Sequence, residues 1–402
     1  MAMTIEELLK LAMQKGASDL HLKAGIIPVI RRHGSLRPLA ANMPALSGEE
    51  IEAMAASLMD DRQKALFAEF HEVDLSYGIS GLGRFRANVF QQRGTIRMVV
   101  RNIPHTVPTL EDLGLPASLK KITEYERGLV LVTGATGSGK SSTLAALVDE
   151  INRTKNNHIL TIEDPIEFLI RDRKSIITQR EIGVDSTSYA RALRAALRQD
   201  PDVILIGEMR DRETIEIALT AAETGHLVFS TLHTLDAVET VNRVVSAFEM
   251  HQQNQVRMQL ASVLKAVVSQ RLARRFDNQG FIPAVEIMIN NPRVREIIER
   301  NETGATLHNV IEEGGIGWGM QTFDQSLMEL VMSGKVLFEE ALSLSTSPED
   351  FRIRYSGVSQ DGREWSDSSE HRQRINKAMK EMDEIEVDYP TDVRPKKAQG
   401  QD

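Results

Sequence analysis

The chain of 402 residues contains no cysteine, and this absence excludes several kinds of site at once. Without cysteine a protein cannot form disulfides, bind an iron–sulfur cluster through thiolates or hold zinc on cysteine ligands. The lack of cysteine is also compatible with a chain that works in a reducing cytoplasm.

Long hydrophobic runs and an excess of basic charge are missing too. No run approaches the roughly 18 apolar residues of a membrane helix. Glu6 and Glu7 lie near the start, where a secretory signal would carry basic residues. Lys and Arg number 48 against 57 Asp and Glu, a net charge of −9. This balance argues against a protein that binds a polyphosphate backbone. We expect a cytoplasmic protein that binds no nucleic acid and reaches a membrane only by docking on a membrane complex.

The chain is long enough for two or three domains. Residues 1–101 predict a small α/β domain, because apolar residues near the start recur at helical spacing. Ser47 and Glu50 form a capping box ahead of a second helix. Three segments are short, β-rich and punctuated by glycine, as expected of an antiparallel sheet: 73–79, 83–94 and 95–103.

A change of pattern follows the first domain. Residues 102–116 contain three prolines and read as a linker. Over 117–355, apolar runs alternate with helical stretches, which predicts an α/β domain with a mostly parallel sheet. Residues 356–402 are polar and predict a disordered tail. The apolar runs are 128–134, 158–162, 202–207 and 226–232.

A phosphate-binding loop lies between the first apolar run and a helical stretch. Residues 134–141, GATGSGKS, match G-x-x-x-x-G-K-S. Backbone N–H groups of such a loop converge on phosphate oxygens, Lys140 reaches the β/γ-phosphates, and Ser141 ligates Mg²⁺. The helix that follows adds its N-terminal dipole. The sequence therefore predicts ATP and Mg²⁺ as cofactors. The candidate nucleotide-binding residues are Gly134, Ala135, Thr136, Gly137, Ser138, Gly139, Lys140, Ser141 and Ser142.

Two acidic clusters compete for the roles of metal ligand and water-orienting group. In VILIGEMRD (203–211) the usual first acid at the strand end is replaced by Gly207, and Glu208 remains to hold Mg²⁺ directly or through water. In TIEDPIEF (161–168) Glu163 or Asp164 ends another apolar run, and parallel strands present their carboxyl ends at one edge. A carboxylate there can orient the attacking water. From these residues alone, a turn at Asp-Pro and a solvent-facing Glu208 stay open.

Histidines and arginines add further candidates. His233 ends the last apolar run at the same edge, whereas His226 begins that run at the opposite edge, and either can be purely structural. A basic cluster in the first domain is either a set of solvated strand residues or a source of arginine fingers for another subunit. Its members are Arg84, Arg86, Arg93, Arg97 and Arg101.

Together these motifs resemble the secretion-ATPase superfamily, the hexameric motors of type II and type IV secretion and of type IV pili. The resemblance covers residues from about 4 to 351. The matching motifs, in chain order, are ASDLHL (17–22), the phosphate-binding loop, TIEDPIEF as the aspartate box, GEMRD (207–211) as Walker B, and AAETGHLVFSTLHT (221–234) as the histidine box.

The resemblance implies a PAS-like N-terminal α+β domain, then a RecA-like ATPase domain, in a homohexameric ring. It also implies that each N-terminal domain packs on the neighbouring ATPase domain. The site residues that it implies are Glu163 as the catalytic carboxylate, Glu208 on Mg²⁺, Lys140 on the phosphates, His226 and His233 of the histidine box, and Arg86 and Arg101 reaching the nucleotide across domains.

Within the superfamily, the absence of cysteine favours the pilus-retraction branch. Pilus-extension and type II secretion members typically carry a four-cysteine zinc subdomain, which this chain cannot build. The predicted function is therefore an ATP-hydrolysing motor that depolymerises pilin and drives twitching motility. It would act at the pilus base, peripheral to the inner membrane, on the inner-membrane pilus platform protein.

Two differences from the pilus-retraction branch keep a second branch of the superfamily as an alternative. Residues 293–301, RVREIIERN, differ from the retraction motif AIRNLIRE in the order of the last charges. The longer C-terminus and MQTFDQSL (320–327) are similar to the accessory retraction ATPase, a paralogue that is also a possible partner. Less favoured alternatives are a RecA-like nucleic-acid translocase and a non-hydrolysing nucleotide-gated scaffold.

Overall fold

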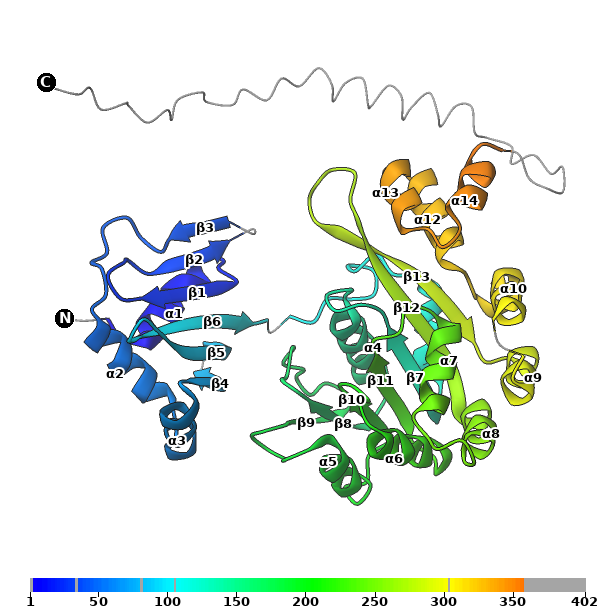
Figure 1. Ribbon diagram of the computed structural model, residues 1–402, viewed down its shortest axis with the longest axis horizontal. Helices are drawn as coiled ribbons and strands as arrows, with labels where there is room; N and C mark the ends of the chain where they lie inside the picture. The colour runs from blue at the N-terminus through cyan, green and yellow to red at the C-terminus, as the bar shows by residue number, and fades with distance from the viewer. Residues whose placement is uncertain (1–2, 33–34, 80–81, 105, 303, 358–402) are drawn as a thin grey trace, which may run out of the picture. The chain divides into compact units, whose positions relative to one another are not determined.

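A computed structural model of the protein describes residues 3–32, 35–79, 82–104, 106–302 and 304–357 (Figure 1). Beyond residue 357, the predicted polar tail lies outside the described residues. The chain separates into two compact units. The first comprises Met1–Arg271 with Val285–Gln321, and the second comprises Leu272–Ala284 with the chain from Thr322. The predicted domain boundaries at residues 101, 116 and 355 remain predictions.

The N-terminal part of the first unit contains an antiparallel sheet, as predicted, and its six strands lie in the order β3-β2-β1-β6-β5-β4. Its strands are β1 Asp19–Lys23, β2 Val29–Arg32, β3 Ser35–Pro38, β4 Glu72–Ile79, β5 Gly83–Gln92 and β6 Thr95–Ile103. Its helices are α1 Ile5–Gln14, α2 Gly48–Leu58 and α3 Asp61–Phe70. The capping box of Ser47 and Glu50 begins α2, as predicted. A PAS-like identity for this sheet remains a prediction.

A separate core holds this antiparallel sheet together. Phe85, Ala87 and Val89 alternate along β5 and are all buried, as one covered sheet face requires. Leu8 and Leu9 of α1 and Ile51 of α2 pack into the same cluster. The cluster contains only residues of this N-terminal part.

The rest of the first unit is built on a seven-stranded sheet in the order β13-β12-β7-β11-β10-β8-β9. Its strands are β7 Gly128–Thr133, β8 His158–Glu163, β9 Ile176–Glu181, β10 Val203–Ile206, β11 Leu227–Leu232, β12 Leu264–Arg274 and β13 Phe281–Ile289. Every pairing from β12 to β9 is parallel, which confirms the predicted mostly parallel sheet. The four apolar runs form β7, β8, β10 and β11, whereas β9, β12 and β13 were not predicted.

Two cores cover the faces of this sheet. In β10, Val203 and Leu205 enter one core, and Ile204 and Ile206 enter the other, because successive side chains of a strand point to opposite faces. The helical segments around the sheet are η1 Ala117–Glu124, α4 Lys140–Thr154, α5 Tyr189–Ala196, α6 Arg212–Glu223, α7 Ala237–Ser246, α8 Gln253–Val263, α9 Pro292–Arg300, α10 Ala305–Glu313 and α11 Gly315–Trp318. The sheet is thus buried on both faces, so a site has room only at the ends of its strands.

The second unit has its own small core of helices. They are α12 Phe323–Met332, α13 Phe338–Leu344 and α14 Pro348–Tyr355. The ring of Phe338 stacks on Phe351 and Tyr355, with centroid separations of 6.0 and 4.4 Å. Leu327 and Val331 of α12 are fully buried in this core.

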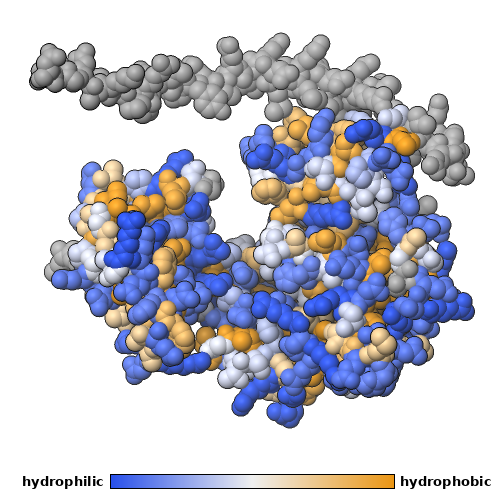
Figure 2. All heavy atoms as spheres, viewed as in Figure 1, coloured by the Kyte–Doolittle hydropathy of each residue, from blue (hydrophilic) through white to orange (hydrophobic). Residues whose placement is uncertain are grey.

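The surface of the described residues is of the ordinary mixed kind. On the face drawn in Figure 2, hydrophobic residues lie scattered among hydrophilic ones. Exposed large apolar side chains include Met250 and Phe281. None of the helices within the described ranges is both long enough and apolar enough to span a membrane.

Candidate active site

The phosphate-binding loop joins the end of β7 to the start of α4, the context that its motif requires. Gly134 has φ +139°, a conformation that L side chains rarely adopt. A Cβ at this position would collide with the carbonyl of Gln270 in β12 and lie 2.6 Å from Ser138 Oγ. Gly139, with φ +90°, is the N-cap residue of α4. The helix N-terminus therefore faces the loop, where its dipole favours phosphate.

Lys140 is the first residue of α4 and is largely buried. Its Nζ donates to the carbonyls of Gly134 at 2.8 Å and Ala135 at 3.0 Å. Burial lowers the pKa of Lys140, and the negative charge of Glu208 opposes that shift. The lysine is therefore held within the loop and close enough to Glu208 for their charges to interact.

The strand order gathers the remaining motifs at one edge. Because β7, β11, β10 and β8 are neighbours and parallel, the segments that follow them lie next to one another. Along this edge the order is the phosphate-binding loop, His233, Glu208 and Glu163. Four separate sequence motifs thus become one site.

Glu208 lies in the middle of this edge, and only 12% of its side chain is exposed. Its carboxylate is 2.5 Å from a guanidinium nitrogen of Arg210 and 3.4 Å from Nε2 of His233. The hydrogen bond to Glu208 raises the pKa of Arg210. Sequence reasoning did not single out Arg210, although its place two residues after Glu208 could have signalled that both lie on one side of an extended segment.

Glu163 is the last residue of β8, and its carboxylate is held by two neutral donors. Thr161 Oγ1 donates to Oε1 at 2.7 Å, and the Gln179 amide donates to the same oxygen at 3.1 Å. Burial raises the pKa of Glu163, whereas these hydrogen bonds act in the opposite direction. Asp164 and Glu167, the other acids of this motif, are exposed. The geometry thus separates Glu163 from its acidic neighbours.

Two amide side chains support the segment after Glu163, and neither was predicted. Gln179 also donates to the carbonyl of Phe168 at 3.0 Å and accepts from the amide of Ile170 at 2.9 Å. Asn152 of α4 is fully buried. It donates to the carbonyl of Arg171 at 2.8 Å and accepts from the amide of Arg173 at 3.1 Å. Residues 168–173 are therefore joined to both β9 and the phosphate-binding helix.

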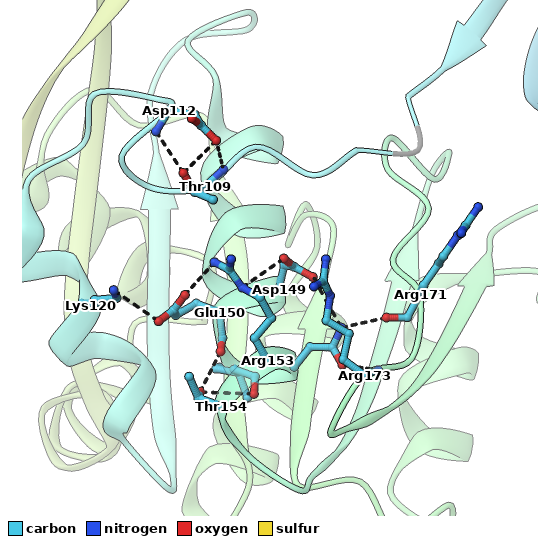
Figure 3. Close-up of polar contacts among 11 residues, drawn as sticks. Thr109, Asp112, Lys120, Asp149, Glu150, Arg153, Thr154, Arg171 and Arg173 are labelled. Atoms are coloured by element: carbon cyan, nitrogen blue, oxygen red, sulfur yellow. Dashed lines mark hydrogen bonds and ion pairs between the residues drawn. The ribbon is translucent and has the colours of Figure 1, made fainter.

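A cluster of charges continues this support along α4 (Figure 3). Asp149 lies 3.5 Å from Arg153 and 3.4 Å from Arg173. Glu150 pairs with Arg153 at 2.8 Å and with Lys120 of η1 at 3.5 Å. The two carboxylates are mostly buried, whereas the cations are partly or largely exposed. This network ties the helix that begins at Lys140 to two neighbouring segments.

Three predicted residues do not meet the phosphate-binding loop. His226 precedes β11 at the opposite edge of the sheet, where its Nδ1 lies 2.9 Å from the carbonyl of Ala221. In the antiparallel sheet, Arg86 is 3.9 Å from Asp74 and Arg101 is 2.8 Å from Asp19. Among the described residues, none of their hydrogen bonds or ion pairs reaches the loop. Roles for these three in the site remain predictions.

A phosphate-binding loop at the carboxyl edge of a mostly parallel sheet, with carboxylates on two adjacent strands, defines a P-loop nucleotide hydrolase. The chain belongs to the type II/IV secretion system protein family, which matches residues 1–311. It is an ATPase of that family.

Two relatives from Pseudomonas aeruginosa illustrate the similarity. The chain is 47% identical over 349 residues to the type IV pilus retraction ATPase PilT, covering 87% of this chain and all of PilT. It is 40% identical over 353 residues to the type IV pilus ATPase PilU, covering 87% and 91%. A solved structure of the pilus retraction motor PilT with bound ADP aligns with a TM-score of 0.80 at 44% identity, covering 87% of this chain and 98% of that one. The similarity to retraction ATPases inferred from the motifs is confirmed.

Proposed function

We propose that this chain is the ATP-hydrolysing motor of type IV pilus retraction, working as a homohexamer on the cytoplasmic side of the inner membrane. The observation that carries the proposal is the near full-length similarity to PilT, which exceeds that to PilU. The intact loop and both carboxylates support turnover rather than a passive scaffold. The partner at the pilus base would be the inner-membrane platform protein.

The donors at the sheet edge fit a magnesium nucleotide. Mg²⁺ prefers hard oxygen ligands, and the hydroxyl of Ser141 and the carboxylate of Glu208 supply them. When bound there, Mg²⁺ would neutralise charge on the phosphates. Lys140 and the amides of the loop bind the same phosphates. His233, 3.4 Å from Glu208, would sense the γ-phosphate through that carboxylate.

Glu163 would orient the attacking water and accept its proton. A carboxylate with a raised pKa is a better proton acceptor near neutral pH than an ordinary glutamate. Thr161 and Gln179 hold Oε1 and leave Oε2 for water, apart from a long contact of 3.5 Å from the amide of Glu167. The two glutamates thus have different tasks, because their surroundings differ.

Hydrolysis would change the angle between the N-terminal domain of one subunit and the ATPase domain of the next. Arg86 and Arg101 would approach the nucleotide across such an interface, where arginine stabilises charge on transferring phosphates. His226 would act on the nucleotide site through β11, the strand that it directly precedes. Passed around the ring, this motion would move the platform protein and depolymerise the fibre.

A pair of matched substitutions tests the roles of the glutamates. Glu163→Gln should bind ATP with near wild-type affinity while kcat falls by about a hundredfold or more, because the water loses its base. Glu208→Gln should instead weaken the Mg²⁺ dependence of nucleotide binding. Normal turnover in Glu163→Gln beside an inactive Glu208→Gln would reverse the two assignments.

The cellular role is tested by deleting the gene and scoring surface pili and twitching. Retained pili with lost motility are expected of a retraction motor, and lost pili would refute the proposal. The 40% identity to PilU favours an accessory retraction ATPase as a second candidate. Expression of this chain in a strain without any other retraction ATPase separates the two, because only an independent motor restores twitching there.

A further inference from the structure

Gly207 occupies the place where the Walker B motif usually has its first acid, and its backbone is held on both sides. Its N–H donates to the carbonyl of Ile162 in β8 at 2.8 Å. Its carbonyl accepts from the hydroxyl of Thr231 in β11 at 2.7 Å. The direction in which a side chain at residue 207 would point is therefore set by the sheet.

That direction leads to a tyrosine hydroxyl. A Cβ built on Gly207 would lie 2.9 Å from Oη of Tyr189, 3.3 Å from the carbonyl of Ile162 and 3.4 Å from Cα of Glu163. A distance of 2.9 Å is too short for a carbon atom beside that oxygen. The space of the missing acid is thus taken by Tyr189, and it borders on Glu163.

Tyr189 reaches this position because it begins a helix that packs on the sheet. It is the first residue of α5, which Ser188 caps by accepting from the amide of Arg191. The ring packs against the core between the helices and the sheet. Among the described residues, the Tyr189 hydroxyl has no hydrogen-bond partner. An amphipathic ring with a free polar tip is thus directed to the catalytic edge.

The surroundings of this hydroxyl are strongly acidic. Burial raises the pKa of Tyr189, and the charges of Asp164, Glu208 and Glu163 raise it further, while Arg210 opposes them. The hydroxyl therefore stays protonated throughout the physiological range. It keeps both an O–H to donate and lone pairs to accept.

We propose that the Tyr189 hydroxyl replaces the missing first acid and positions water between Glu163 and Glu208 at the nucleotide site. Tyr189 is thus a positioning residue, because it acts through water rather than on the phosphates. A neutral hydroxyl suits this place, since an acid at residue 207 would add a further negative charge beside those of Glu163, Asp164 and Glu208. Mg²⁺ usually keeps several of its waters, and these need oxygen partners. The proposal rests on the proposed roles of Glu163 and Glu208.

The first test removes only the hydroxyl. Tyr189→Phe keeps the ring in the core and should retain the fold and the affinity for ADP without metal. The affinity for Mn²⁺ in the ADP complex, measured by electron paramagnetic resonance, should fall about three- to tenfold, the range of one hydrogen bond. The kcat for ATP should fall by a similar factor with KM unchanged.

Tyr125→Phe is the matched control. Tyr125 is also partly buried, but it precedes β7 at the opposite end of that strand from the phosphate-binding loop, and its ring lies near Lys265. This variant should change neither quantity. Mn²⁺ affinity within twofold of wild type in Tyr189→Phe would overturn the proposal, whether or not kcat changed.

The second test asks whether the hydroxyl fills the space beside Gly207. Gly207→Ala alone should lower the thermal midpoint, because the methyl group would displace Oη of Tyr189. In a Tyr189→Phe background the same methyl group should cost less, since the oxygen is gone. A double-mutant cycle measures this coupling. Additive effects would overturn the assignment.

A failure of the role proposed for Tyr189 can be distinguished from a failure of the proposed function. Loss of Mn²⁺ binding in Glu208→Gln supports the metal role on its own, whatever Tyr189→Phe does. Pili and twitching report on retraction and do not enter the measurements on Tyr189. Unchanged Mn²⁺ affinity in Tyr189→Phe, together with weakened affinity in Glu208→Gln, would refute only the role of Tyr189.

Discussion

The hydroxyl of Thr161 donates a 2.7 Å hydrogen bond to the carboxylate of Glu163, two residues further along the same strand. Thr161 is fully buried, and this contact occupies its only side-chain donor. Residues two apart on a strand lie on the same side of the sheet. The carboxylate that we propose to be catalytic is thus oriented by its own strand.

Thr161→Val removes this donor while nearly conserving volume. Hydrogen bonds to the charged form lower the pKa of Glu163, so their loss should raise it further. The acid limb of the pH profile of kcat should therefore move to higher pH, and kcat at neutral pH should fall about three- to tenfold. Thr123→Val is the control, because that buried hydroxyl donates to the carbonyl of Lys120, away from the site. An unshifted acid limb in Thr161→Val would show that the bond does not tune Glu163.

The raised pKa of Glu163 also predicts how stability depends on pH. A carboxyl whose pKa is raised by folding stabilises the protein fully below its unfolded pKa, and that contribution is lost as pH rises through the folded pKa. Above the folded pKa the native state therefore carries a destabilising buried charge. Glu163→Gln has no such charge, so its thermal midpoint should exceed that of the wild type near pH 8.

The stability difference should shrink as the pH is lowered towards the ordinary range of a glutamate. Differential scanning fluorimetry at several pH values measures it. Glu167→Gln is the control, because Glu167 is exposed and no comparable burial acts on it. A thermal midpoint of Glu163→Gln below that of the wild type at pH 8 would contradict the predicted direction of the stability change. The expected gain in stability with a loss of turnover is common at catalytic sites.

The parts of the site that follow strands of strong apolar character could be predicted from sequence. β7, β8, β10 and β11 are buried on both faces and read as continuous apolar runs. In contrast, β9 was missed because it contains Thr178, Gln179 and Arg180 and is only partly buried. One of these polar residues, Gln179, donates to the carboxylate of Glu163.

The support of the carboxylates could not be predicted, because it depends on strand order and helix packing. Gln179 meets Glu163 only because β9 pairs with β8 in a parallel register that aligns Glu163 with Glu181. Tyr189 reaches Gly207 only because α5 packs on the sheet beside β8 and β10. The sequence shows that Gly207 stands where an acid is usual, but no local pattern shows which distant side chain fills the space of that acid.

Asn152→Ala should loosen the segment that follows Glu163. The substitution removes the fully buried amide of Asn152, and with it the partly buried hydrogen bonds to the carbonyl of Arg171 and from the amide of Arg173. Such losses cost about 2 kcal/mol or more. Hydrogen exchange in residues 168–175 should accelerate by about thirtyfold.

Arg173→Met tests the same segment through its ion pair instead. The side chain of Arg173 is 55% exposed and its guanidinium lies 3.4 Å from Asp149, so water screens the pair and its loss should cost less than about 1 kcal/mol. Exchange in Arg173→Met should thus stay within a few-fold of wild type. Equal acceleration in both variants would show that charge, rather than the buried amide, holds the segment.

Gly134→Ala should abolish nucleotide binding through a backbone effect. The new Cβ would collide with the carbonyl of Gln270 and with Ser138 Oγ at a φ of +139°, so the loop must leave the conformation that directs its amides at phosphate. The affinity for a fluorescent ADP analogue should fall at least about a hundredfold. Gly183→Ala is the matched control, because Gly183 also has a positive φ, of +88°, but a Cβ there meets nothing within 4 Å. It should cost about 1 kcal/mol of stability and leave affinity within twofold. Unchanged affinity in Gly134→Ala would mean that β12 shifts to make room for the methyl group while the loop keeps its conformation.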